Sequence, residues 1–214
     1  MARRLKQLTF DDRPGWGGKR RGAGRPRRAL RRRVAHRSRD AFARRAPLHV
    51  TLRMAPHVYS LRSQRSLRVM QRALLGGGDR FEVRVVQASV QGNHVHLLVE
   101  APDQMALGRA MKGLAVRIAR GLNKLMDKQG RTSGDRRMFD DRYHTRRLRS
   151  PTEVRSVMHY IRYNHQHHGL SRAVVDAYSS DGLLSGLLPS ATLWMLTVGW
   201  KRGRVAKVPE ESAP

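Results

Sequence analysis

The sequence predicts an α+β fold, a ferredoxin-like split βαβ sandwich with helices on one face of an antiparallel sheet and an extra C-terminal helix. Two observations carry this prediction. Segments with the two-residue period of strands and segments with helical period follow one another as strand, helix, strand, strand, helix, strand, helix. A Gly92-Asn93 turn joins the two consecutive strand segments, which favours an antiparallel hairpin between them.

The strands are identified by the alternation of apolar and polar side chains. In the first strand Leu48, Val50 and Leu52 share one face. In the second strand the alternation changes phase at Val85 and Val86, which predicts a β-bulge. The four strands are expected at residues 47–54, 81–90, 94–100 and 142–148.

The helices are identified by apolar side chains that recur every three or four residues. A run of glycines, residues 76–78, ends the first helix, and Pro151-Thr152 begins the last. The three helices are expected at residues 63–75, 105–128 and 151–169. The middle helix has the most regular apolar stripe, formed by Leu107, Met111, Leu114, Ile118, Leu122 and Leu125.

Both ends of the chain differ from the predicted domain at residues 47–169. Residues 1–46 carry 17 Lys and Arg against 3 Asp and Glu and contain few apolar residues, so we expect a disordered basic arm. Its Gly24-Arg25-Pro26 core resembles an AT-hook, which inserts arginine into an A·T-rich minor groove; a generic basic tail is the alternative. Residues 170–214 form an expected C-terminal extension, whose uncharged run at 183–200 is expected to pack on the domain rather than span a membrane.

The charge of the chain indicates a polyanionic partner. The formal net charge is +28, and residues outside the arm are also basic, with 27 Lys and Arg against 13 Asp and Glu. Nucleic acid is the expected partner, because the arm contains no basic amphipathic helix with a bulky apolar face. The absence of cysteine excludes disulfides and thiolate metal sites.

Two histidines stand one residue apart in the third predicted strand. Alternate side chains of a strand share a face, so His94 and His96 point the same way, while Val95, Leu97 and Val99 point into the core. Two imidazoles at this spacing can chelate one divalent ion. Solvated histidines on a half-exposed strand have the same pattern, and a metal site requires at least one further ligand.

The last predicted helix offers a phenol and an amide. Tyr160 and Asn164 are one turn apart, so they lie together along the border of the buried face. A structural amphipathic helix with a tyrosine at its boundary has the same pattern. The predicted buried face consists of Val154, Val157, Met158 and Ile161.

The histidine strand and the tyrosine helix together resemble the HUH-type single-tyrosine transposases, most closely the REP-associated tyrosine transposases and IS200-like enzymes. The stretches that carry the resemblance are NHVHLLVE (93–100), HYIRYN (159–164) and DAYSS (176–180), which is similar to a Tyr-Ser-Ser stretch after the last helix of the family. The resemblance extends from Pro47 to Ser180.

The resemblance implies a role for four residues. His94 and His96 match the two metal-binding histidines of the family. Tyr160 matches the nucleophile, and Asn164 matches the polar residue that completes the metal site.

The sequence departs from the family pattern at two motifs, and, as a third departure, the arginine-rich arm and the tail at residues 181–214 lie outside the resemblance. The family commonly has proline where this chain has Gly92, and Asn-Pro-Val is replaced by Asn164-His165-Gln166. The second departure leaves His167 and His168 as alternatives to Asn164 for the third metal ligand.

The resemblance implies a metal-dependent transposase that cleaves and rejoins single-stranded DNA through a 5′-phosphotyrosine intermediate, with Mg²⁺ or Mn²⁺. The expected partner is single-stranded or hairpin DNA, without a membrane or a small-molecule cofactor. The expected form is a monomer or homodimer in the cytoplasm, associated with the nucleoid. Two alternatives remain: a non-catalytic DNA- or RNA-binding protein on the same fold, and a metal phosphoesterase that uses water.

Further side chains are expected to bind the nucleic acid, through phosphate contacts and, for Tyr143, through stacking on a base. Tyr163 is expected to face solvent. The predicted nucleic-acid-binding residues are Arg20, Arg21, Arg25, Arg27, Arg28, Arg117, Arg120, Tyr143, Arg146 and Arg147.

Overall fold

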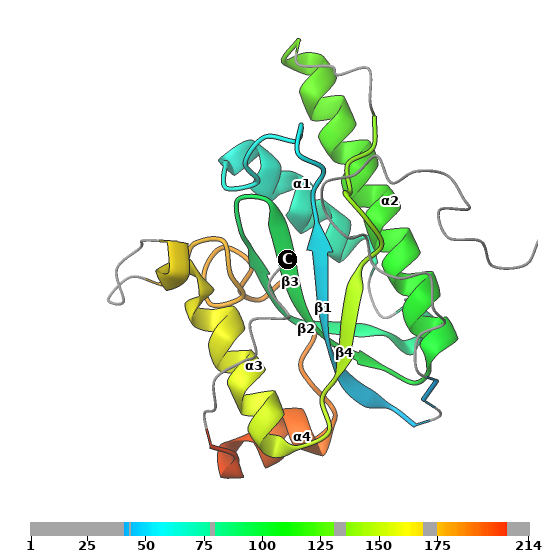
Figure 1. The fold of residues 1–214 in the computed structure, drawn as a ribbon, viewed down its shortest axis with the longest axis vertical. Coiled ribbons are helices and arrows are strands. Elements are labelled where there is room, and N and C mark those ends of the chain that lie inside the picture. The colour runs from blue at the N-terminus through cyan, green and yellow to red at the C-terminus, as the bar shows by residue number, and fades with distance from the viewer. Residues whose placement is uncertain (1–40, 43, 78–79, 131–135, 169–174, 205–214) are drawn as a thin grey trace, which may run out of the picture. The chain divides into compact units, whose positions relative to one another are not determined.

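Four strands form one antiparallel sheet in the order β2-β3-β1-β4 (Figure 1). β1 (Ala46–Arg53) lies in the centre and pairs with both β3 (His94–Ala101) and β4 (His144–Arg147). β2 (Arg84–Val90) forms the outer half of a hairpin with β3. This strand order confirms the predicted split βαβ arrangement.

The computed structural model describes residues 41–42, 44–77, 80–130, 136–168 and 175–204. All of these residues belong to one compact unit. The AT-hook-like segment and its arginines, Arg20, Arg21, Arg25, Arg27 and Arg28, lie outside the described residues.

Each face of the sheet is covered by helices. α1 (Gln64–Leu75) and α2 (Gln104–Lys128) pack on the face that carries Leu48, Val50 and Leu52 of β1. α3 (Pro151–Tyr163) and the short α4 (Trp194–Thr197) pack on the opposite face, where Leu98 of β3 belongs to a second apolar cluster. In Figure 1 the two pairs of helices lie on different sides of the sheet. The extra helix, α3, therefore covers the face of the sheet on which His94 and His96 lie, because Leu98 shares that face of β3 with them.

The helices begin where the sequence predicts, because each has a side chain that caps its first turn. The hydroxyl of Ser63 accepts a hydrogen bond from the backbone of Ser66, and Asp103 does the same for α2. Ser150 caps α3, whose first residue is Pro151. The three predicted starts are confirmed to within one residue.

Two predicted boundaries are wrong by three residues or more. β2 begins at Arg84 rather than at residue 81, because Phe81 and Glu82 have φ angles of 60° and 57°, which a strand does not allow. α3 ends at Tyr163 rather than at residue 169, and residues 164–168 form a 3₁₀ turn rich in asparagine and histidine, which have low helix propensity. The predicted bulge is confirmed by a shift in register between Val85 and Gln87.

The C-terminal segment is held against the domain by polar contacts. The buried carboxylate of Glu100 accepts hydrogen bonds from Thr192 and from the backbone of Leu193, at 2.6 to 2.8 Å. Arg155 of α3 donates to the carbonyl oxygens of Lys201 and Gly203. The segment therefore packs on the domain as expected. None of the described helices combines the length and the hydrophobicity that a bilayer span requires.

Candidate active site

His94 and His96 lie side by side on the face of β3 that is covered by α3. Both are buried, and their ring centroids are 4.6 Å apart. His96 is in the middle of the sheet, opposite Thr51 of β1 and Ser89 of β2. The alternation of β3 places Val95 in the opposite core, as predicted.

Hydrogen bonds to Nδ1 orient both imidazole rings. Nδ1 of His94 lies 2.7 Å from Oδ1 of Asn93. A carboxamide oxygen only accepts hydrogen bonds, so Nδ1 of His94 is the donor in this contact, and a neutral ring then has its lone pair on Nε2. Nδ1 of His96 lies 3.2 Å from both Nε2 of His49 and Oγ1 of Thr51. A neutral imidazole with its lone pair on Nε2 is a suitable metal ligand.

Tyr160 of α3 reaches this pair of histidines. Its hydroxyl lies 3.5 Å from Nε2 of His96, and the two ring centroids are 5.1 Å apart in an edge-to-face arrangement. Burial raises the pKa of the Tyr160 phenol above its ordinary value. The structure therefore brings together the strand and the helix that the sequence singles out, although they are 64 positions apart.

Asn164 is the buried residue that follows α3. It is 1% exposed, and its Nδ2 has no hydrogen-bond partner among the described residues. The unpartnered Nδ2 is a hydrogen-bond donor, so an acceptor on a ligand would satisfy it, whereas a metal ion would bind the carboxamide oxygen. Within the described parts of the chain, no group of three His, Asp or Glu side chains is arranged to hold a metal ion. Asn164 as third ligand stays a prediction, and the side chains of the alternatives His167 and His168 lie outside the described residues.

The family model for IS200-like transposases matches residues 49–164, which is more than half of the chain. The chain belongs to the IS200-like transposase family. This assignment confirms the expected class of enzyme, an HUH-type tyrosine transposase, and this family generally uses a divalent metal. The matched residues begin at His49 and end at Asn164, so they include both histidines and Tyr160.

The fold of the transposase is shared by a solved structure. The structure of the REP-associated tyrosine transposase bound to a REP hairpin superposes with a TM-score of 0.55 at 13% identity, covering 82% of this chain and 96% of that one. A crystal structure of a proposed transposase from Deinococcus radiodurans R1 is 16% identical, with a TM-score of 0.40, covering 59% of this chain and 95% of that one. No curated protein matches the sequence.

The other tyrosines of the transposase have different surroundings. Tyr163 is half-buried, and its ring lies 4.5 Å from that of His159, which corrects the expectation that it faces solvent. Tyr143 is half-buried against the core under α1 and α2, and its stacking on a base stays a prediction. Of these three tyrosines, Tyr160 is the one whose hydroxyl contacts His96.

His49 is a member of the site that the sequence reasoning missed. It lies on β1, is 1% exposed, and its ring stacks on that of His96 with centroids 5.2 Å apart. Burial, with smaller contributions from His144 and Arg146, lowers the pKa of His49 from 6.5 to about 4. The sequence did contain a signal for His49. It stands between Leu48 and Val50 in the first strand, so its side chain lies on the opposite face of the sheet from theirs.

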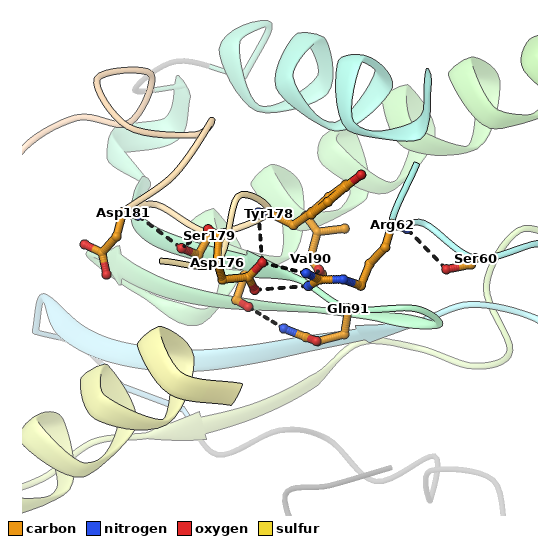
Figure 2. Close-up of polar contacts among 9 residues, drawn as sticks. Ser60, Arg62, Val90, Gln91, Asp176, Tyr178, Ser179 and Asp181 are labelled. Carbon is orange, nitrogen blue, oxygen red and sulfur yellow. Dashed lines mark hydrogen bonds and ion pairs between the residues drawn. The ribbon is translucent and has the colours of Figure 1, made fainter. Parts of the chain in front are cut away.

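The DAYSS stretch of the transposase lies along the free edge of β2. The backbone N–H of Val90 donates to the carbonyl oxygen of Tyr178, and that of Ser180 donates to Ala88, both at 2.8 Å. Figure 2 shows the guanidinium of Arg62 facing the carboxylate of Asp176 beside the ring of Tyr178. The stretch therefore covers an edge strand that would otherwise present unpaired backbone groups.

Asp176 holds this stretch through a buried ion pair. Arg62 donates to both carboxylate oxygens at 2.7 and 3.0 Å, and it also donates to the carbonyl oxygen of Val90. Burial alone would raise the pKa of Asp176, but the hydrogen bonds from Arg62 and from the Tyr178 backbone outweigh it, so the pKa is lowered. The same segment reaches α3, because Arg162, two residues after Tyr160, pairs with Asp181.

The predicted nucleic-acid-binding arginines occupy two different places. Arg146 of β4 is in register with His49, so it lies on the face of the histidines, and its guanidinium is 3.4 Å from Glu153. Arg147 follows it at the edge of the sheet. Arg117 and Arg120 lie on α2, across the sheet, where Arg117 donates to the carbonyl oxygen of Ala73. Of these four arginines, Arg146 is the one that lies on the face of the histidines. DNA binding by all four stays a prediction.

Gly92 is predicted to be replaceable by alanine. A Cβ atom at this position would meet only Oγ of Ser60, at 3.6 Å, and its φ lies outside the left-handed region. Because alanine restricts the unfolded chain, Gly92→Ala is expected to stabilise the protein by about 0.4–1 kcal/mol in urea denaturation. Gly182→Ala is the control: its Cβ would collide with the backbone of Asp176, so it is expected to destabilise. A destabilising effect of Gly92→Ala would contradict the prediction.

Proposed function

We propose that this transposase cleaves and rejoins single-stranded DNA through a covalent bond between Tyr160 and a 5′-phosphate. The observation that carries the proposal is the contact of 3.5 Å between the Tyr160 hydroxyl and Nε2 of His96, in a buried cluster with His94. A phenol beside two imidazoles is an arrangement that suits a metal-assisted tyrosine nucleophile, because the imidazoles can bind the ion next to the attacking hydroxyl.

In the proposed step, Oη of Tyr160 attacks the phosphorus atom of a phosphodiester. A bond forms between Oη and phosphorus, the bond from phosphorus to the 3′-oxygen breaks, the phenolic proton is released, and the departing 3′-oxygen takes up a proton. The energy of the diester is conserved in the phosphotyrosine, so attack by a 3′-hydroxyl reverses the step and joins strands without ATP.

His94, His96 and Asn164 would hold a divalent ion, Mg²⁺ or Mn²⁺. The contacts at Nδ1 of both histidines support this assignment, because they leave Nε2 available for the ion, and the ligand atom of the buried Asn164 would be its carboxamide oxygen. When bound, the ion polarises the phosphoryl oxygen and neutralises the charge that develops on it. The protein presents the two histidines from β3, the phenol from α3 and the amide from the residue that follows α3.

Single-stranded DNA with a hairpin is the proposed substrate. The solved relative with the same fold is described as bound to a REP hairpin. The net charge of +28 supports a polyanion, and Arg146 beside the histidines would contact a phosphate. A flexible strand is needed because the scissile phosphate has to approach Tyr160 on a covered face of the sheet.

The proposal is tested with a hairpin oligonucleotide with single-stranded flanks, taken from the DNA beside the gene and labelled at either end. With Mg²⁺, the 3′ label is expected to become covalently attached to the protein, while the 5′ label appears on a shorter free product. Both products are expected to disappear with EDTA. Cleavage without attachment would indicate the water-using phosphoesterase, and binding without cleavage would indicate a DNA-binding protein.

A further inference from the structure

A third histidine lies directly behind the pair of proposed metal ligands. His49, on the neighbouring strand β1, points its Nε2 at Nδ1 of His96 across 3.2 Å. The two rings are stacked, with an angle of 27° between their planes. His49 is also 6.1 Å from the ring of Tyr160, so it adjoins both halves of the site.

The contact between the two imidazoles has two possible directions. If Nε2 of His49 carried its proton, it would donate to Nδ1 of His96. The proton of His96 would then lie on Nε2, and this nitrogen could not bind a metal.

Metal binding through Nε2 of His96 requires the opposite direction, because the neutral ring then carries its proton on Nδ1. Two groups lie 3.2 Å from Nδ1 and can accept this proton: Nε2 of His49, and the hydroxyl of Thr51, which lies directly across from His96 in the sheet. In the adjacent proposed ligand His94, Nδ1 likewise faces an acceptor, Oδ1 of Asn93.

We propose that His49 is a positioning residue that accepts the Nδ1 proton of His96 and thereby keeps the lone pair of His96 on the nitrogen that faces Tyr160. The inference rests on the proposed function, because it assumes that His96 is a metal ligand. Partners of this kind fix the tautomer and orientation of a ligating imidazole, and their loss typically weakens metal binding by about 10- to 100-fold.

The test compares two polar replacements in the full-length protein. In His49→Gln the amide reaches the position of Nε2 and can accept the proton, whereas the shorter side chain of His49→Asn reaches only the position of Nδ1. We expect Mn²⁺ binding, measured by electron paramagnetic resonance of the unbound ion, to weaken about tenfold in His49→Asn and to stay within about threefold of the parent in His49→Gln. DNA cleavage by His49→Asn is expected to recover when the Mn²⁺ concentration is raised.

A second measurement needs no variant. In the metal-free protein labelled with ¹⁵N-histidine, two-bond ¹H–¹⁵N correlations assign the proton of each ring, and His96 is expected to carry it on Nδ1. A proton on Nε2 of His96, or equal Mn²⁺ affinity of His49→Asn and the parent, would overturn the role of His49. If instead the parent binds no Mn²⁺, or His94→Ala binds it equally well, the proposed metal site fails, and the inference fails with it.

Discussion

Tyr160→Phe is expected to abolish the covalent protein–DNA adduct and to slow cleavage of the hairpin by at least about 10³-fold. The substitution removes only the hydroxyl that lies 3.5 Å from Nε2 of His96 and keeps the ring that packs against it. The fold should therefore be retained while the nucleophile is lost. The measurement is single-turnover cleavage, with the adduct resolved by denaturing electrophoresis.

Tyr163→Phe is the matched control, because Tyr163 lies on the same helix but its ring contacts His159 instead of His96. It is expected to cleave at nearly the rate of the parent. An adduct that persists in Tyr160→Phe and disappears in Tyr163→Phe would reassign the nucleophile.

The rate of cleavage by the parent is expected to depend on pH. Burial raises the pKa of Tyr160, so the protonated phenol dominates at neutral pH and the reactive phenolate is a small fraction. The rate should then rise with pH, by about tenfold per unit, until the operative pKa is reached. A single-turnover rate that does not change between pH 6 and 9 would contradict this expectation.

Asp176→Ala is expected to lower the free energy of unfolding by about 3 kcal/mol, because it leaves the Arg62 guanidinium without its buried partner. For a domain of this size the corresponding decrease in Tm is about 6–12 °C. The replacement also removes a link between the DAYSS stretch and β2, since Arg62 donates both to the Asp176 carboxylate and to the carbonyl oxygen of Val90. Differential scanning calorimetry measures the loss, and hydrogen exchange at Val90 reports the exposed edge.

Asp181→Ala is the control in the same segment. Asp181 also pairs with an arginine, Arg162, but both side chains are partly exposed, so the expected loss is at most about 1 kcal/mol. If the free energy of unfolding fell equally in the two variants, burial of the Asp176 ion pair would not be the cause of its larger expected contribution.

The contribution of the Asp176 ion pair to stability is expected to decrease as the pH falls. Because its pKa is lowered from the ordinary value of 3.8, its contribution to stability is complete above that value and is lost as the pH falls through the lower pKa of the folded state. Acid should therefore destabilise the parent more than Asp176→Ala. The Tm of both proteins as a function of pH below 5 tests this.

Local periodicity was sufficient to predict most of the fold and half of the site. Alternation along residues 94–100 sets which side chains of β3 share a face, and this depends only on strand geometry. Capping residues such as Ser150 mark helix starts through contacts within one turn. The end of α3 was predicted less well, because the 3₁₀ turn at residues 164–168 has no strong stop signal such as glycine or proline.

The sequence by itself determined the class of fold, the side of β3 on which the histidines lie, and, through the resemblance of two motifs, the family. The tertiary structure alone decided which distant groups meet. His49 contacts His96 because β1 and β3 pair in one particular register, and Asp176 meets Arg62 across 114 positions because the DAYSS stretch pairs with β2. Such contacts arise from the packing of whole elements, and no pattern within one strand or helix encodes them.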